Sequence, residues 1–181
     1  MKYPIGIQHF EKLRTDGFVY VDKTALVHKM VQEGNYYFLS RPRRFGKSLL
    51  ISTLKAYFEG KRELFQGLAM EQLEKEWRVH PVLRLDLNTE KYDSPDSVDK
   101  KLDREFKIWE EIYGADEAEV TLPMRFEGII RRAYKKTGER VVILIDEYDK
   151  PLLQAISNKP LQNEYRATLK AVYGALKSMD G

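Results

Sequence analysis

The spacing of hydrophobic positions changes several times along the chain, and each spacing predicts one kind of element. Apolar runs at 36–40, 82–87 and 141–146 are short and either continuous or alternating, which is typical of strands. The last run begins Val-Val-Ile-Leu-Ile and is largely β-branched, as in strands that are covered on both faces. A shorter strand is predicted at 18–21, after a Thr-Asp-Gly turn at 15–17.

Between these runs the apolar residues recur every three or four positions, which predicts helices. Glycine or proline marks several of the expected helix ends, and Asp22 is placed to cap the first helix. The expected helices cover about 22–34, 47–58, 69–77, 94–113, 121–138 and 160–179. Strands that alternate with helices predict the α/β class, with a mainly parallel sheet between helical layers.

Segment 40–48, Ser-Arg-Pro-Arg-Arg-Phe-Gly-Lys-Ser, joins the first long strand to a helix and indicates a phosphate-binding loop. Gly46 would let the backbone approach a phosphate, Lys47 would reach the β- and γ-phosphates, and Ser48 would ligate Mg²⁺. Arg41 stands where the usual pattern has its first glycine. The alternative is an ordinary helix N-terminus with Lys47 in solvent. The expected nucleotide-binding residues are Arg43, Arg44, Phe45, Gly46, Lys47, Ser48 and Leu49.

The apolar run at 141–145 ends in two adjacent carboxylates, Asp146 and Glu147. An acid at the tip of a strand beside a phosphate loop can hold Mg²⁺ through water, which is the role predicted for Asp146. The adjacent Glu147 can then orient and deprotonate a water aimed at the γ-phosphate. Alternatively, both acids only solubilise the end of a strand. Lys150 lies either in a loop near the γ-phosphate or in a surface turn.

The composition sets the broad class of the protein. The 181 residues are 43% hydrophobic and 33% charged, as in an ordinary globular domain, and there is no cysteine. No apolar segment is long enough for a membrane span, so we expect no membrane association and a cytoplasmic location. The net charge is +3, and basic residues are interleaved with acids, so nucleic-acid binding is only weakly supported. The three histidines have no spacing typical of metal ligands.

Three segments resemble the bacterial AAA-ATPase-like family: Tyr-Val-Asp-Lys-Thr at 20–24, the phosphate loop, and Leu-Ile-Asp-Glu-Tyr-Asp-Lys-Pro at 144–151. The resemblance covers nearly the whole chain. It implies a P-loop three-layer sandwich over 1–181, with about 1–34 leading into the core, and a catalytic glutamate at Glu147. Related proteins are longer and have a further strand between the phosphate-loop strand and the Asp-Glu strand. We therefore expect an incomplete core that is filled by 18–21, by a homo-oligomer or partner chain, or by more polypeptide if this is a shortened fragment.

These features together predict an ATP-binding, Mg²⁺-dependent domain that hydrolyses ATP if the missing strand and a sensor residue are supplied. A small-molecule kinase is a second interpretation, which would need an arginine-rich lid, for which Arg131 and Arg132 are the candidates. A third is a regulatory or interaction module that binds nucleotide, or nothing, without turnover.

Overall fold

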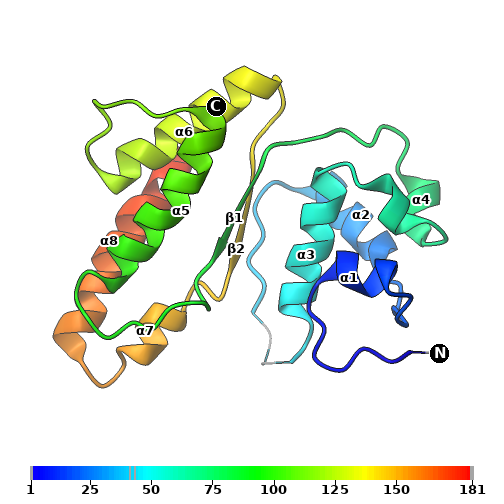
Figure 1. Cartoon of the computed structure of the whole chain (residues 1–181), viewed down its shortest axis with the longest axis horizontal. Helices are drawn as coiled ribbons and strands as arrows, with labels where there is room; N and C mark the ends of the chain where they lie inside the picture. The colour runs from blue at the N-terminus through cyan, green and yellow to red at the C-terminus, as the bar shows by residue number, and fades with distance from the viewer. Residues whose placement is uncertain (1, 41, 43, 180–181) are drawn as a thin grey trace. The chain divides into compact units, whose positions relative to one another are not determined.

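The computed structural model describes residues 2–40, 42 and 44–179, and the chain divides into two compact units. The N-terminal unit comprises 1–82 and the C-terminal unit comprises 83–181, and each is described by itself (Figure 1). The prediction of one P-loop domain over the whole chain stays a prediction. None of the described helices is both long enough and apolar enough to cross a membrane.

The N-terminal unit is a group of helices around aromatic side chains. Its core is built from ring contacts: Phe10 lies against Phe65 with ring centroids 4.9 Å apart, and Phe65 lies against Trp77 with centroids 5.2 Å apart. The backbone N–H of Phe10 donates to the hydroxyl of Ser52 at 2.9 Å, which ties the first helix to the third. The helices are α1 Phe10–Thr15, α2 Thr24–Glu33, α3 Lys47–Phe58, the 3₁₀ helix η1 Arg62–Phe65 and α4 Ala69–Leu73.

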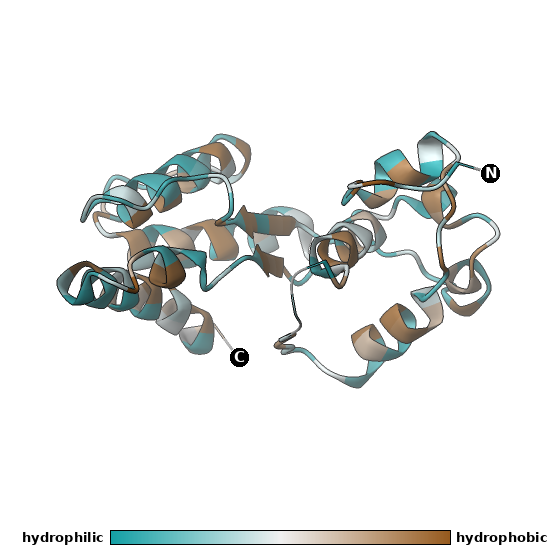
Figure 2. Cartoon of the chain, turned by 90° about the horizontal axis from the view of Figure 1, so that it is seen from below, coloured by the Kyte–Doolittle hydropathy of each residue, from teal (hydrophilic) through white to brown (hydrophobic). Residues whose placement is uncertain are grey.

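The C-terminal unit packs helices around a small parallel sheet. Strands β1 Val82–Asp86 and β2 Val142–Asp146 are neighbours, and the N–H of Leu87 donates to the carbonyl of Asp146 at 3.1 Å. Figure 2 draws both strands largely in the hydrophobic colour, whereas the helices of this unit carry both hydrophilic and hydrophobic residues. The helices are α5 Ser97–Tyr113, α6 Leu122–Thr137, α7 Lys150–Gln154 and α8 Lys159–Ser178. This arrangement confirms the α/β class.

The long helices of this unit follow the periodic pattern of the sequence. On α5, the residues Val98, Leu102 and Phe106 are fully buried at the expected spacing of four, in one core with residues of α6 and α8. Helix α6 begins after Thr121, whose hydroxyl accepts from the N–H of Met124, and ends at Gly138 in the left-handed conformation. Both boundaries agree with the prediction.

The expected strand at 36–40 is wrong. The described backbone at 36–40 belongs to no strand, and its side chains are exposed, with 72% of Phe38 accessible. A strand is stable only beside a neighbour that pairs its backbone groups, and the sheet found in the described residues contains only β1 and β2. Residues 18–21 do not supply that neighbour, because Phe18 forms only an isolated bridge with Lys2. Within the N-terminal unit, helix α3 packs on α1. Its expected packing against a sheet stays a prediction.

Two helix boundaries also differ from the prediction. Helix α4 ends at Leu73 rather than near Trp77, because the carboxylate of Glu74 accepts from the N–H groups of Lys75 and Glu76 and so offers the backbone an alternative to the helix. Helix α5 begins at Ser97 rather than at Ser94, since Ser94 forms a turn whose carbonyl accepts from the Ser97 N–H at 3.0 Å.

Candidate functional site

The phosphate loop has a left-handed backbone at two of its described residues. Arg44 has φ 67° and Gly46 has φ 76°, and α3 begins directly after Gly46. Glycine adopts this conformation without steric cost, whereas for arginine it is uncommon. A left-handed residue beside right-handed ones turns successive N–H groups toward a common point, which makes an anion-binding concavity.

The start of α3 adds further donors to the loop. The first N–H groups of a helix have no acceptor within the helix, and the first helical bond here runs from the Leu50 N–H to the Gly46 carbonyl at 2.9 Å. The N–H groups of Lys47, Ser48 and Leu49 lie ahead of that bond, at the positive end of a 12-residue helix. A loop with this backbone geometry is able to bind an anion such as a phosphate.

The side chain of Lys47 folds back over this loop. Its ammonium donates to the carbonyl of Pro42 at 3.4 Å, in an exposed position. Phe45 is largely exposed. The expected residues Arg41 and Arg43 lie outside the described residues.

The two predicted carboxylates, unlike the lysine, lie at the end of a strand. Asp146, the last residue of β2, is only 4% exposed, and its carboxylate accepts from the N–H of Glu147 at 3.1 Å. Glu147 has φ 52°, a left-handed backbone conformation that is uncommon for residues other than glycine. Strained backbone of this type is concentrated at functional sites. The strand therefore ends in a buried acid followed by an acid that the chain holds in an unfavourable backbone conformation.

The carboxyl end of β1 brings further polar groups to the same edge of the sheet. The carboxylate of Asp86 accepts from the Asn88 N–H at 2.8 Å, and the carbonyl of Asn88 accepts from the ammonium of Lys150 at 3.4 Å. The side-chain oxygen of Asn88 also accepts from this ammonium. Sequence reasoning missed Asp86 and Asn88. Polar residues at and just beyond the end of an alternating strand could have pointed to them, because parallel strands end at one edge of the sheet.

The predicted site residues thus form two groups in two different units. Arg44 to Leu49 belong to the N-terminal unit, whereas Asp146 and Glu147 belong to the C-terminal unit. Their convergence on one nucleotide stays a prediction. Within the described ranges there is no group of three or more His, Cys, Asp or Glu side chains placed to hold a metal ion.

Comparison with known proteins identifies the family. Residues 4–181 match the AAA-ATPase-like family, described as "Predicted AAA-ATPase". The chain belongs to this AAA-ATPase-like family. It is also 40% identical over 183 residues to the "Uncharacterized protein in vnfD 5'region" of Azotobacter chroococcum mcd 1. That alignment covers 99% of this chain and 35% of the relative, so the chain spans about a third of that protein's length. No solved structure matches the chain.

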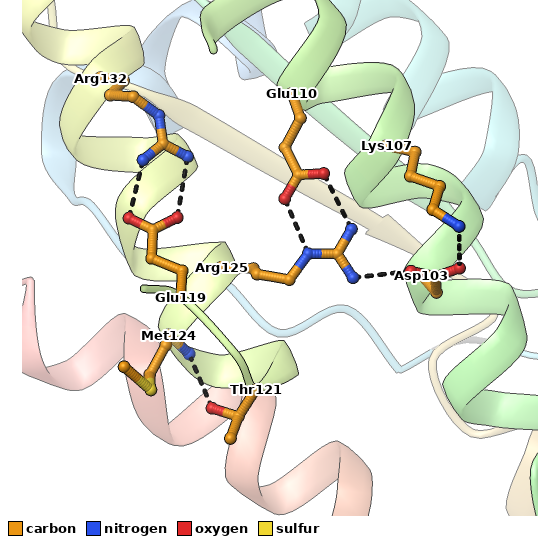
Figure 3. A network of polar contacts seen from close by, with 8 residues as sticks. All are labelled: Asp103, Lys107, Glu110, Glu119, Thr121, Met124, Arg125 and Arg132. Carbon is orange, nitrogen blue, oxygen red and sulfur yellow. Dashed lines mark hydrogen bonds and ion pairs between the residues drawn. The ribbon is translucent and has the colours of Figure 1, made fainter. Parts of the chain in front are cut away.

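One of the two arginines proposed for a kinase lid has a structural role in this AAA-ATPase-like chain. Arg132 donates from two nitrogens to the carboxylate of Glu119, at 2.7 and 3.0 Å (Figure 3). Gly128 leaves room for that carboxylate, since a Cβ there would lie 1.8 Å from a Glu119 oxygen. Arg132 therefore fastens the loop before α6 to α6 itself, which removes one of the two lid candidates.

A second ion-pair network in Figure 3 is also structural. Arg125 of α6 donates to both carboxylate oxygens of Glu110 and to Asp103, at 2.7 to 2.9 Å. The bond to Glu110 is the main reason that the pKa of Arg125 lies above its ordinary value. These contacts join α5 to α6.

Proposed function

We propose that this chain binds Mg²⁺ and ATP, with the phosphates held by the loop N–H groups and by Lys47. The observation that carries the proposal is the loop itself: left-handed Arg44 and Gly46 lead directly into α3, with Lys47 at its first position. Loops of this geometry bind phosphate because their N–H donors and the helix end favour the same anion. Membership of the AAA-ATPase-like family supports a nucleotide as the source of that phosphate.

The burial of Asp146 supports a cation at the end of β2. A buried carboxylate is costly unless it is paired with a positive charge or fully hydrogen-bonded. Among the described residues the carboxylate of Asp146 has one donor, the N–H of Glu147. A hydrated Mg²⁺ ion, also ligated by Ser48, would supply the missing compensation. Water between the ion and the carboxylate is usual for Mg²⁺, which dehydrates reluctantly.

Hydrolysis follows from the same arrangement if Glu147 acts as the general base. In the described structure its carboxylate makes no hydrogen bond or ion pair, so it is available to a water molecule. The water oxygen would attack the γ-phosphorus as its proton passes to Glu147, and the bond from the γ-phosphorus to the leaving ADP oxygen would break. Lys47 and Mg²⁺ would stabilise the charge on the phosphoryl oxygens.

We further propose that turnover needs a completed sheet. Both β1 and β2 have one unpaired edge in the two-stranded sheet, so a further strand would extend it toward the three-layer sandwich of P-loop proteins. Additional polypeptide, a second copy of this chain or another protein would supply that strand together with the sensor residue. ATP binding depends on fewer groups and should be measurable first.

The test is a titration of the chain with AMP-PNP, a non-hydrolysable ATP analogue, with and without Mg²⁺. Wild-type protein should bind and its melting temperature should rise, because a ligand that binds only the folded state stabilises that state. Lys47→Ala should abolish both effects. Glu147→Gln is the matched variant, which should keep binding and lose any phosphate release from ATP.

The outcomes separate the alternatives. An unchanged response in Lys47→Ala would reject the assigned role of the lysine. Loss of binding in Glu147→Gln would show that Glu147 is a ligand or a structural residue rather than a base. Binding by the wild type without phosphate release would favour the regulatory module.

A further inference from the structure

Lys150 occupies a particular place at the carboxyl edge of the sheet. It is the first residue of α7, and its N–H donates to the carbonyl of Glu147 at 3.0 Å, which closes the turn after β2. Its ammonium crosses to the end of β1, where it donates to the carbonyl of Asn88 at 3.4 Å and to the side-chain oxygen of the same residue. Lys150 therefore spans the ends of both strands.

The positive charge of Lys150 is not neutralised by these contacts. Both acceptors on Asn88 are uncharged oxygens, and no carboxylate of the described residues forms an ion pair with this ammonium. Lysines elsewhere in the same unit differ: Lys100 pairs with Asp96, and Lys101 pairs with Glu105. An ammonium held on neutral oxygens keeps its full attraction for an anion and loses little when it changes partner.

The surroundings of Lys150 allow an anionic ligand to reach it. Asn88 is exposed, so the edge of the sheet is open to solvent at that point. Ligands of parallel α/β sheets bind beyond the carboxyl ends of the strands, which is where Lys150, Asp146 and Glu147 lie together. The left-handed backbone of Glu147 is part of the turn that Lys150 closes, so the lysine and the proposed base belong to one rigid local structure.

We propose that Lys150 is a second phosphate-binding lysine, which leaves Asn88 and contacts the terminal phosphate of the bound nucleoside triphosphate. The proposal rests on the proposed function, because it concerns the same site. Because Lys150 closes the turn that carries Glu147, its ammonium would contact the phosphate next to the water that Glu147 would activate. Asn88 is a positioning residue that holds the ammonium at the edge when no triphosphate is present.

The consequence is a preference for triphosphate over diphosphate. ADP lacks the phosphate that Lys150 contacts, so removing the lysine ammonium should weaken AMP-PNP binding and leave ADP binding close to that of the wild type. A hydrogen bond between charged groups contributes enough that we expect the loss for AMP-PNP to be on the order of tenfold or more.

The experiment is calorimetric titration of AMP-PNP and ADP, each with Mg²⁺, into the wild type, Lys150→Gln, Asn88→Ala and Lys135→Gln. Lys135→Gln is the control, because Lys135 is an exposed lysine on α6 of the same unit. We expect Lys150→Gln to lower the ratio of AMP-PNP to ADP affinity by about tenfold. Asn88→Ala removes the resting contact but keeps the ammonium, so it should retain the triphosphate preference, as should Lys135→Gln.

Each other result overturns a defined part of the account. If the wild type binds neither nucleotide, the proposed function is wrong, and the proposal for Lys150, which depends on it, is wrong as well. If the wild type prefers AMP-PNP and Lys150→Gln keeps that preference, the proposal for Lys150 is wrong while nucleotide binding stands. If Lys150→Gln and Asn88→Ala lose the preference equally, the contact between the two residues matters and a direct phosphate contact is refuted. Should Lys150→Gln fail to fold, Lys150→Met and Asn88→Ala provide the same comparison.

Discussion

The two units of this chain bury apolar surface in different ways. The C-terminal unit has a parallel strand pair and three long helices that share one core. The N-terminal unit relies on short helices around an aromatic cluster, and leaves the apolar segment 36–40 exposed. A helix satisfies its own backbone, whereas a strand needs a neighbour. The difference teaches that a strand pattern is realised only where its partner is also present.

The same contrast separates the two parts of the proposed site. Asp146 is nine-tenths buried or more because it ends a strand that has a neighbour and a helical cover. The loop that carries Lys47 follows a segment with no strand partner among the described residues, and the lysine is only half-buried. One half of the site is therefore held by a packed core, and the other half is held by the local geometry of a helix start.

The largest expected effect comes from weakening the core of the C-terminal unit. Phe106 is 0% exposed and stacks on Phe126 with ring centroids 5.2 Å apart. Phe106→Ala should lower the free energy of unfolding of this unit by about 3–5 kcal/mol, because the cavity is deep in the core. Urea denaturation should be followed by Trp109 fluorescence in a Trp77→Phe background, so that the signal comes from the C-terminal unit alone. The chain has two tryptophans, one in each unit.

Ile108→Ala on the same helix is the matched control for that prediction. Ile108 is 46% exposed, so its truncation should change the free energy of unfolding by well under half as much. Equal effects of the two substitutions would contradict the core described for this unit.

A smaller effect is expected in the N-terminal unit, where Asp22 joins two helices. Its carboxylate accepts from the N–H and the hydroxyl of Thr24, at 2.8 and 2.7 Å, and from the N–H of Ala69 at 2.7 Å. Burial acts to raise the pKa of Asp22, but these hydrogen bonds outweigh it, so the pKa lies below its usual value. The N-cap position of α2 is Lys23, but Asp22 accepts from the first N–H of that helix much as a capping side chain does. Asp22→Ala should therefore cost about 1 kcal/mol at neutral pH.

The pH dependence of that cost has a defined sign. A carboxyl whose folded pKa is lowered stabilises the protein above its unfolded pKa of about 4, and that contribution is lost as the pH falls through the folded pKa. The difference between wild type and Asp22→Ala should therefore shrink at low pH, as measured by Trp77 fluorescence in a Trp109→Phe background. Glu33→Ala, which removes an exposed ion pair with Lys29, is the control. A cost that stays constant down to pH 3 would show that Asp22 acts without its charge.

Sequence reasoning recovered the elements whose signals are local. Strands β1 and β2 and helices α3, α6 and α8 lie within about two residues of their predicted bounds, since periodicity, caps and terminal glycines act within a few residues. It failed at 36–40, where the outcome depends on a partner strand. It also missed the contact between Lys150 and Asn88, which lie 62 residues apart and meet only because β1 and β2 pair. No local pattern carries that information.

The most direct test of the central claim asks whether one nucleotide contacts both units. The chain has no cysteine, so a spin label can be attached at Tyr148→Cys, next to the proposed base, or at Val120→Cys as a control. Figure 1 places the loop that contains Val120 at the other end of the C-terminal unit from α7. With Mn²⁺ in place of Mg²⁺, bound AMP-PNP should broaden the label at 148 more than the label at 120, and Lys47→Ala should abolish the effect. Mn²⁺ and AMP-PNP that bind without broadening the label at 148, or that broaden it equally in Lys47→Ala, would contradict the account.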